Sequence, residues 1–248
     1  MNKFDHFSEA AFSFLKDLKE NNTQAWFKEN QGLYDQELKE PTRALAGILS
    51  NTLRTLTGEN QVPKIYRIYR DVRFSKDKRP YNTHVHLSFS RDLENANTPN
   101  WFFGWDTEGL TLGCGVFQYN NNALEPFRGL MSGEMGERMM ALTSASRDTG
   151  LRVGKPALKR IPTGYPKDHP NANALRRKGL LVWNDLEGPL AATQPGFVTR
   201  CADEFSKLLD VYTILRDIEL QMTRSAAIRQ ERTRESDASN GLETITQA

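Results

Sequence analysis

Two histidines, His84 and His86, are separated by a single residue in the stretch HVHLSFS. On a β-strand, residues two apart point to the same face, so this spacing presents two imidazoles side by side. Such a pair can hold a metal ion if His169 or Asp71 supplies a third ligand. As neutral rings, the same pair can hydrogen-bond an anion or transfer protons near pH 7. The surrounding lysines and arginines would repel a cation, so we expect no bound metal, and no motif indicates another cofactor.

The segment RDVRFSKDKRPY, shortly before the histidines, concentrates positive charge in a predicted loop. Pro80 and the polar run at residues 75–78 indicate a connection between strands. Arginine offers a planar fork of donors that suits carboxylate or phosphate, and lysine adds a mobile point charge. We therefore predict that this first loop forms one wall of an anion-binding pocket, with His84 and His86 on its floor. The predicted wall residues are Arg70, Arg73, Lys76, Lys78, Arg79 and Tyr81.

A second loop, LKRIPTGYPKDHP, combines basic, aromatic and histidine side chains in the same way. Its similarity to the first loop predicts the opposite wall of one pocket, formed by Lys159, Arg160 and Tyr165 together with His169. The residues fit an enzyme and a binding protein equally well. If the chain is an enzyme, acid–base or phosphoester chemistry is the first reaction class to test, with His169 or Asp71 as the catalytic group.

The net charge of +2 is distributed unevenly along the 248 residues. Residues 64–91 contain eight lysines and arginines against two acidic residues, and residues 152–178 contain eight against one. Three of the four histidines lie in the same two segments. Such a concentration of positive charge predicts an anionic partner. Our leading hypothesis is a phosphorylated or otherwise multiply anionic small molecule.

Two other functions fit the same charges. A nucleic-acid-binding module would use them to neutralise phosphates, and its affinity would fall steeply with salt. Alternatively, the loops have a structural or protein-interaction role, in which Asp71 and Asp77 pair with Arg70, Arg73 or Lys78 and hold the turn. If the pairs are structural and buried, replacing Arg73 destabilises the empty protein. If the loop serves a ligand, the same change leaves stability almost unaltered.

The sequence argues against several functional classes. It contains no GxxxxGK[ST], no strand-linked GxGxxG and no GxSxG. Cys114 and Cys201 lack the spacing of a metal site or a disulfide framework and fit reduced thiols. No apolar run approaches the ~20 residues that cross a bilayer. The N-terminal stretch MNKFDHFSEAAFSFLKDLKE carries charges where a secretory signal is apolar. We therefore expect a cytoplasmic protein without a membrane partner.

The elements that position these loops begin with helices. Ser8 is typical of an N-cap, and apolar residues then recur on one helical face as far as residues 21–22. Thr23 is a second candidate N-cap, and Pro41 suits the first turn of a third helix. The N-terminal part of the chain is therefore predicted to be a helical cap packed on the core.

The middle of the chain changes to the periodicity of strands. Apolar and polar side chains alternate over residues 84–90, which predicts a half-buried strand, and NWFFGWD and LTLGCGVF around TEG predict a hairpin. A helical stretch over residues 123–146 follows, with a break at Gly133. KPALKRIP and LLVWND are then predicted to be short strands, and a long helix opens at Pro195.

This order of elements predicts an α+β fold with a helical N-terminal cap, a central, mainly antiparallel sheet and a long C-terminal helix. We expect residues 1–224 to form a single domain. Residues 225–248 are polar and contain few apolar side chains, so they are predicted to be a disordered tail.

Three blocks of the sequence resemble a known family. RIYRDVRFSKDKRPYNTH and LKRIPTGYPKDHP are similar to the two most distinctive blocks of the conserved-hypothetical family called domain of unknown function 2461. FLKDLKENNTQAWFKENQGLY is similar to that family's N-terminus, so the resemblance covers Phe4 to Tyr212. It implies a bacterial-type single α+β domain and brings no substrate or catalytic residue. The sequence departs from the family pattern at Asn82, where lysine is common.

Overall fold

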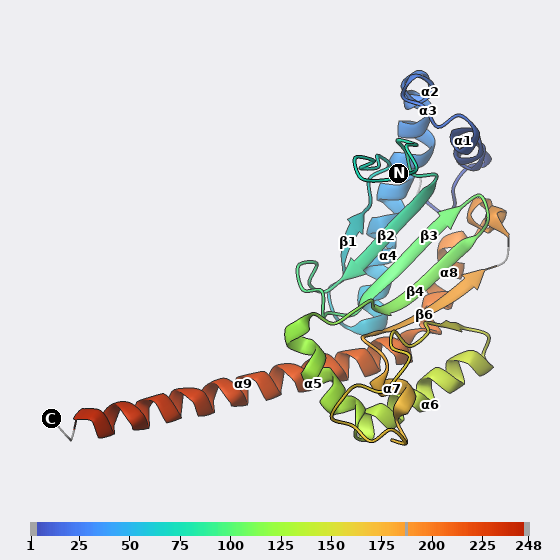
Figure 1. The fold of residues 1–248 in the computed structure, drawn as a ribbon. Helices are drawn as coiled ribbons and strands as arrows, with labels where there is room; N and C mark the ends of the chain where they lie inside the picture. Colours follow the sequence, from blue (N-terminus) through green and yellow to red (C-terminus); the bar gives the residue numbers. More distant parts are fainter. Residues whose placement is uncertain (1–3, 187, 246–248) are drawn as a thin grey trace.

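The computed structural model describes residues 4–186 and 188–245 of the chain. Within these residues the chain forms a six-stranded sheet with the order β1-β2-β3-β4-β6-β5, in which all neighbouring strands are antiparallel. Helices precede and follow the strands, and Figure 1 shows the N-terminal helices above and behind the sheet and the later helices behind and below it. The predicted α+β fold, with its helical start, antiparallel sheet and C-terminal helix, is confirmed.

The first two helices begin where the sequence predicts. The Ser8 hydroxyl accepts a hydrogen bond from the Ala11 amide, and the Thr23 hydroxyl accepts one from the Trp26 amide, so both residues are N-caps. Pro41 lies in the first turn of the last helix of this part. The elements are α1 (Glu9–Glu20), α2 (Gln24–Glu29), α3 (Gln31–Leu33), the π-helical turn η1 (Tyr34–Lys39) and α4 (Glu40–Thr57).

The two faces of the sheet have different surroundings. Val85, Leu87 and Phe89 are buried on the face that the helices cover, and the alternation of the strand turns His84 and His86 to the opposite face. The predicted hairpin is confirmed as the third and fourth strands. The strands are β1 (Val62–Ile65), β2 (His84–Ser90), β3 (Asn100–Asp106), β4 (Leu110–Val116), β5 (Arg152–Val153) and β6 (Leu180–Leu186).

The C-terminal helical region departs from the single long helix predicted from Pro195. A break at Lys207 and Leu208 divides it into α8 (Phe197–Ser206) and α9 (Leu209–Ile245). Helix α9 continues through most of the range that the sequence assigns to a disordered tail, and it projects away from the sheet (Figure 1). Residues 246–248 lie outside the described residues. The division into a domain and a tail at residue 224 stays a prediction.

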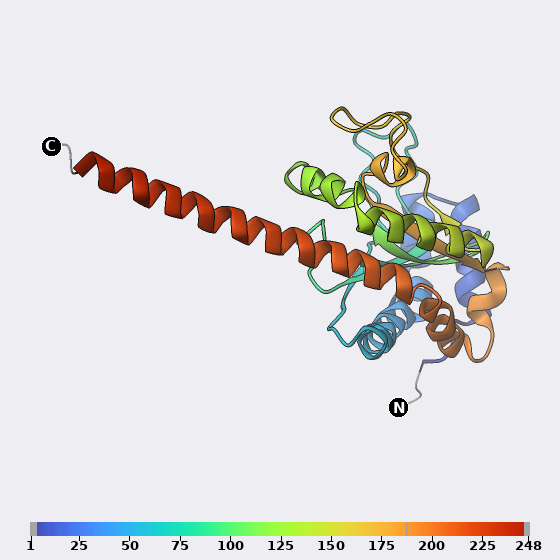
Figure 2. The same cartoon turned by 90° about the horizontal axis from the view of Figure 1, so that it is seen from below.

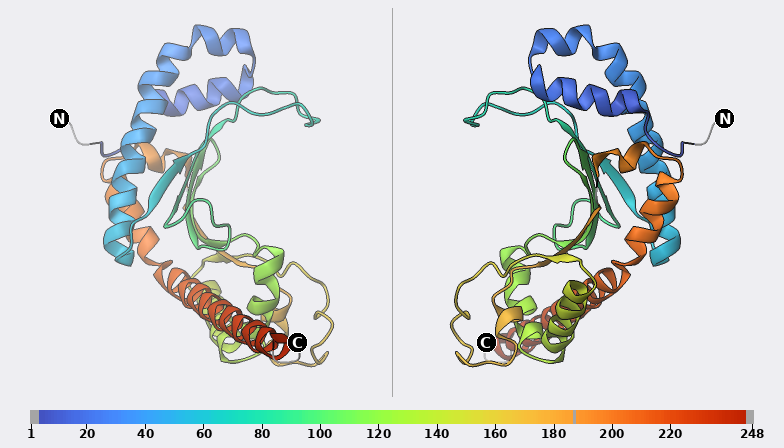
Figure 3. Two further views of the ribbon diagram at one scale, coloured as in Figure 1. Left: turned by 90° about the vertical axis from the view of Figure 1, so that its left-hand side faces the viewer. Right: turned by 90° about the vertical axis from the view of Figure 1, so that its right-hand side faces the viewer.

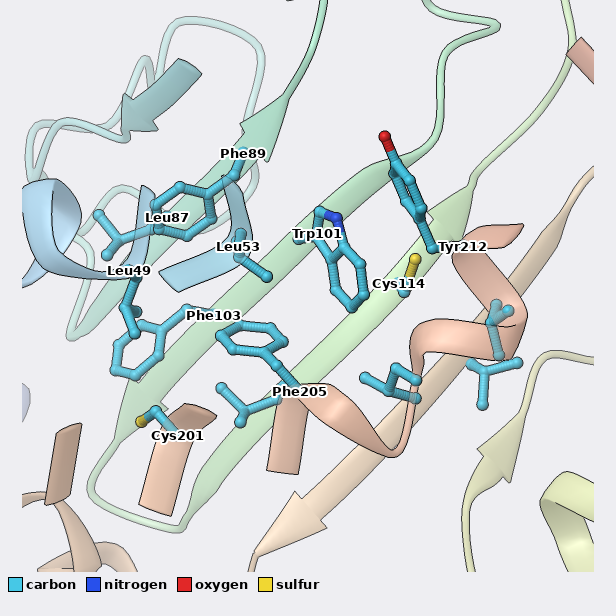
Figure 4. Close-up of a cluster of buried hydrophobic side chains, with 14 of the residues drawn as sticks. Leu49, Leu53, Leu87, Phe89, Trp101, Phe103, Cys114, Cys201, Phe205 and Tyr212 are labelled. Carbon is cyan, nitrogen blue, oxygen red and sulfur yellow. The ribbon is translucent and has the colours of Figure 1, made fainter. Parts of the chain in front are cut away.

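The main core lies between the covered face of the sheet and helices α4, α8 and α9. Trp101 of β3 stacks on Tyr212 of α9 with 5.2 Å between ring centroids, and it meets Phe205 of α8 edge-on at 5.6 Å (Figure 4). Leu49 and Leu53 of α4 are fully buried in the same core. No comparable layer of helices lies over the middle of the opposite face in the described part of the chain (Figure 3). On this face His84 is exposed and His86 and Thr111 are partly exposed, so that part of the face is accessible to a ligand.

The segment between β4 and β6 closes one end of the molecule. The predicted helix breaks at Gly133, as expected, and its two halves lie beside α9 (Figure 2). The strand predicted in KPALKRIP is not formed, since Pro156 and Pro162 have no amide hydrogen for a ladder and the Leu158 amide donates to the Arg176 carbonyl. The remaining elements are α5 (Asn121–Met131), α6 (Glu134–Asp148), α7 (Ala172–Leu175) and the 3₁₀ turn η2 (Pro189–Thr193).

Among the residues that the structure describes, no helix combines the length and the apolar character needed to cross a membrane.

Candidate functional site

The first loop is held at its base by backbone contacts. The Arg70 amide donates to the Pro80 carbonyl at 2.8 Å, and the Asn22 side chain both donates to and accepts from the backbone of Tyr81 at 3.0 Å. The Tyr81 ring is only 5% exposed and stacks on Phe27 with 4.1 Å between centroids. Tyr81 therefore anchors the loop to the helical cap, and its ring does not line the accessible surface of the loop.

The arginines of the first loop are paired within the loop itself. Arg73 binds Asp71 through two nitrogens, with Nη2–Oδ2 at 2.7 Å, and Arg79 binds Asp77 in the same way at 2.8 Å. Arg70 adds a second contact to Asp77 at 2.9 Å. The hydrogen bonds from the guanidinium groups hold the pKa of both carboxyl groups below the usual range. The structural alternative names the pairs of Arg73 with Asp71 and of Arg70 with Asp77, but not the pair of Arg79 with Asp77.

Not every cation near the first loop is neutralised in this way. The Lys78 ammonium donates to the Val72 carbonyl at 3.1 Å, whereas Lys76 and Arg67 form no ion pair among the described residues. A ligand at this loop would therefore meet Lys76 and Arg67 directly. It would have to compete with Asp71 and Asp77 for the other guanidinium groups.

Replacing Arg73 with glutamine is expected to leave the melting temperature within about 2–4 °C of the wild type. The Arg73 side chain is 77% exposed and its partner Asp71 is 44% exposed, so water screens the pair. Thermal melts of the two ligand-free proteins check this expectation. A much larger drop would mean that the ion pairs hold the loop, as the structural alternative requires.

The structure brings the predicted floor of the pocket, His84 and His86, together with Arg70 of the predicted first wall. His84 and His86 line a hollow of about 380 Å³ that also contains Arg70 and Asp71. Burial lowers the pKa of both histidines. At His84 the carboxylate of Asp106 opposes this shift and Arg70 adds to it, and at His86 the neighbouring His84 adds to it. Both rings are therefore neutral near pH 7 and are suited to hydrogen bonding. Sequence reasoning missed further lining residues, namely Tyr66, Arg67, Tyr69 and Asn82.

The second loop forms a separate pocket of about 560 Å³ beside α7. Lys159 and Arg160, both predicted, line it together with Lys167 and Arg176, which sequence reasoning did not select. Lys167 and Arg176 both belong to the basic segment 152–178, so the excess of positive charge in that segment could have identified them. No carboxylate lines the pocket, and none of the four cations forms an ion pair in the part of the chain that the structure describes.

A buried arginine increases the positive charge at this end of the molecule. Arg177 is 1% exposed, donates from Nη1 to the Gly154 carbonyl at 2.6 Å, and has no hydrogen-bond partner for Nη2 within the described residues. Burial, together with Arg147 and Arg176, lowers its pKa to about 10. Arg177 therefore stays protonated at pH 7, and it forms no ion pair among the described residues.

Tyr165 and His169 lie together in the second loop, with 6.5 Å between their ring centroids. The Nδ1 atom of His169 accepts a hydrogen bond from the Asn171 amide at 3.0 Å, which leaves Nε2 for other partners. Neither side chain lines the cationic pocket. The two catalytic candidates, His169 and Asp71, belong to different loops.

The structure does not bring the two loops into one pocket. Both loops project from the side of the sheet opposite to α4 and α8, but they do so at opposite ends of the molecule (Figure 3). Residues of the two loops line different hollows among those found in the described part of the chain. The single pocket with two walls is therefore replaced by two basic regions on one side of the sheet.

The described residues contain no cluster of three or more His, Cys, Asp or Glu side chains placed to hold a metal ion. Cys114 and Cys201 are buried, and burial raises the pKa of both thiols, so neither is an activated nucleophile.

A protein-family model matches most of the chain. The model of a conserved hypothetical protein family, DUF2461, matches residues 10–213, a range that includes both loops and the whole sheet. No curated protein compared with the chain is significantly similar to it.

Proposed function

Because the chain belongs to the conserved hypothetical protein family DUF2461, whose description names no activity, we propose a function from the geometry: binding of a phosphorylated or otherwise multiply anionic ligand. The proposed site is the cationic pocket of the second loop, defined as the hollow lined by Lys159, Arg160, Lys167 and Arg176.

The observation that carries this proposal is the contrast between the two loops. In the first loop, Arg70, Arg73 and Arg79 each have a carboxylate partner. In the cationic pocket, four positive side chains face one hollow without a lining carboxylate, and they repel one another. A bound anion would offset that repulsion, and the charge of Arg177 would add to the attraction.

The donor set suits phosphate in particular. Arg160 and Arg176 carry planar guanidinium groups that can each bind two oxygens of one phosphate, and Lys159 and Lys167 supply mobile point charges. A volume of about 560 Å³ lies within the range of small-molecule sites. The pocket therefore fits a ligand with two phosphates, or with one phosphate and a further acidic group.

Calorimetric titration with pyrophosphate and with a hexose bisphosphate tests the proposal. We expect saturable binding to the wild type and a dissociation constant about 10-fold or more higher for Arg160→Gln, because a charge-assisted hydrogen bond is lost. Arg79→Gln is the matched control, since Asp77 already neutralises that arginine. Binding that is the same in wild type, Lys159→Gln and Arg160→Gln would contradict the proposal.

His169 of the same loop keeps Nε2 available but does not line the cationic pocket, so it would perform acid–base chemistry only on a part of the ligand that extends beyond the four cations. Release of inorganic phosphate from the same ligands, lost in His169→Asn, is the result that would identify an enzyme. If no phosphate is released, the pocket serves binding alone.

A second candidate is a nucleic-acid-binding module. It is supported by the placement of the two basic loops at the two ends of one accessible side of the sheet (Figure 3). A strand of nucleic acid lying across that side would contact both loops, and its affinity would rise with oligonucleotide length and fall steeply with salt. Titrations of single- and double-stranded oligonucleotides at two salt concentrations distinguish this module from a pocket that accepts only small anions.

A further inference from the structure

A third hollow, of about 440 Å³, lies between the π-helical turn η1 and strands β1 and β2. Its site and ligand differ from those proposed above. We propose that this hollow, here called the ring pocket, binds the planar aromatic ring of a small molecule that carries one acidic group. Its lining includes Tyr34, Leu38, Tyr66, Arg67, His84 and His86.

The ring pocket lies beside the π-helical turn η1, which has more residues per turn than an α-helix. The chain passes from α3 through η1 into α4 without leaving the helical region, but in η1 the Glu40 amide donates to the Asp35 carbonyl five residues earlier. Such π-helical turns are rare and occur frequently at functional sites. The turn contributes Tyr34 and Leu38 to the pocket, and Lys39 of the same turn is paired with Asp35 at 2.7 Å.

The opposite wall is aromatic and unusually exposed. Tyr66 stacks on His86 with 4.4 Å between centroids and 11° between planes. Ile65, Tyr66 and Tyr69 are 44%, 42% and 51% exposed, so three large apolar side chains of one short segment remain in contact with water around one hollow. Exposed apolar groups gathered at a concave surface mark binding sites, and aromatic walls favour a flat ring.

The charges of the ring pocket balance except at one position. Asp35 neutralises Lys39, and Glu40, outside the lining, neutralises Arg43. Arg67 lowers the pKa of Asp71 from a distance, but Asp71 is already bound by Arg73, and Arg67 forms no ion pair among the described residues. One free guanidinium at the rim of a neutral pocket matches one acidic group on the ligand.

The two histidines would recognise polar atoms of the ring. Both are neutral near pH 7 because burial lowers their pKa, so each can offer one donor and one acceptor. Burial raises the pKa of Tyr34 to about 12, with a further contribution from Asp35, so its hydroxyl also remains a donor. Arg67 lines both the ring pocket and the neighbouring hollow of the first loop. An acidic group bound by Arg67 would therefore lie next to a ring held in the ring pocket.

The test compares aromatic phosphates with ring-free phosphates by calorimetry. The probes are phenyl phosphate, 1-naphthyl phosphate and adenosine monophosphate, against cyclohexyl phosphate and ribose 5-phosphate. All titrations are repeated with Arg160→Gln, which removes a cation from the cationic pocket of the second loop and leaves the ring pocket unchanged. If the preference for aromatic probes persists in Arg160→Gln, it arises at a site other than the cationic pocket. This conclusion does not depend on whether the cationic pocket itself binds phosphate.

Tyr66→Leu is the decisive variant and Phe74→Leu is its control. Phe74 is 96% exposed and lines neither the ring pocket nor the adjoining hollow of the first loop. We expect aromatic probes to bind about 2- to 10-fold more tightly than ring-free ones, and this preference to disappear in Tyr66→Leu but not in Tyr66→Phe or Phe74→Leu. Arg67→Gln should weaken the aromatic probes about 10-fold, whereas Lys76→Gln should not.

Three results would overturn the ring pocket: no saturable binding of any aromatic probe, equal affinity for aromatic and ring-free probes, or an aromatic preference that survives in Tyr66→Leu. Melting curves of each variant verify that it is folded before its affinity is interpreted.

Discussion

Replacing Glu219 with alanine is expected to lower the free energy of unfolding by about 3 kcal/mol, the low end of the range for breaking a buried ion pair. Glu219 of α9 is almost fully buried. One of its oxygens accepts hydrogen bonds from Arg91 at 2.7 Å and from Thr98 at 3.0 Å, and the other meets Arg216 at 3.2 Å. Its removal leaves two arginines and a buried hydroxyl without this partner.

The expected loss is at the low end because Glu59 faces the same arginines. Glu59 binds Arg216 at 2.9 Å and lies 3.7 Å from Arg91, so part of the positive charge remains compensated. Burial raises the pKa of Glu59, but hydrogen bonds from Arg216 and Tyr212 outweigh it and the net shift is downward. Together, Glu59 and Glu219 join α9 to the sheet, and Glu219→Gln, which keeps a hydrogen bond to Thr98, should cost less than alanine.

Asp217→Ala is the matched control for Glu219→Ala. Asp217 lies two residues away on the same helix and pairs with Arg138, but both side chains are more than a third exposed. Exposed pairs contribute about 0–1 kcal/mol, so this change should leave stability nearly unaltered. Chemical denaturation of the three proteins measures the difference. Equal stabilities of the Asp217 and Glu219 variants would show that the buried network does not hold α9 in place.

Replacing Gly115 with alanine is expected to destabilise the protein by about 3 kcal/mol or more, because the added methyl group has no room. A Cβ atom at Gly115 of β4 would lie 2.2 Å from the Leu180 carbonyl oxygen and 2.8 Å from the Leu181 Cα, both in the backbone of β6. Backbone atoms of a paired strand cannot move aside without breaking the ladder between β4 and β6.

Gly104→Ala provides the control for Gly115→Ala in the same sheet. The nearest atom to a Cβ at Gly104 is the Thr111 carbonyl oxygen at 3.9 Å, an ordinary van der Waals distance. We therefore expect little change in the denaturation midpoint for Gly104→Ala and a large drop for Gly115→Ala. Similar midpoints for the two variants would show that β6 shifts to accommodate the added methyl group despite its pairing with β4.

Sequence patterns predicted the local elements of this fold because those elements depend on neighbouring residues. The caps at Ser8 and Thr23 need only a hydroxyl three residues before the amide that it satisfies. The alternation in β2 needs only a period of two. The break between α8 and α9 was missed, since the apolar repeat continues across Lys207 and Leu208.

The candidate site was predictable as far as it is local in sequence. The pairings of Arg73 with Asp71 and of Arg70 with Asp77 lie within one loop, so they could be foreseen as an alternative. The burial of Tyr81 against Phe27 could not, because the two rings come from distant parts of the chain. For the same reason the contribution of Tyr34 to the ring pocket was not foreseen.

By itself, the sequence determined the α+β order of the elements, the two basic segments and the common face of His84 and His86. Only the tertiary structure decided that the basic segments lie at opposite ends of one side of the sheet. Three arginines of the first segment are paired with carboxylates, whereas the second segment lines a pocket without a carboxylate. The physical reason is the distance along the chain over which each effect acts. Periodicity, capping and charge content act between near neighbours, whereas a pocket depends on which distant elements the packing of the core brings together.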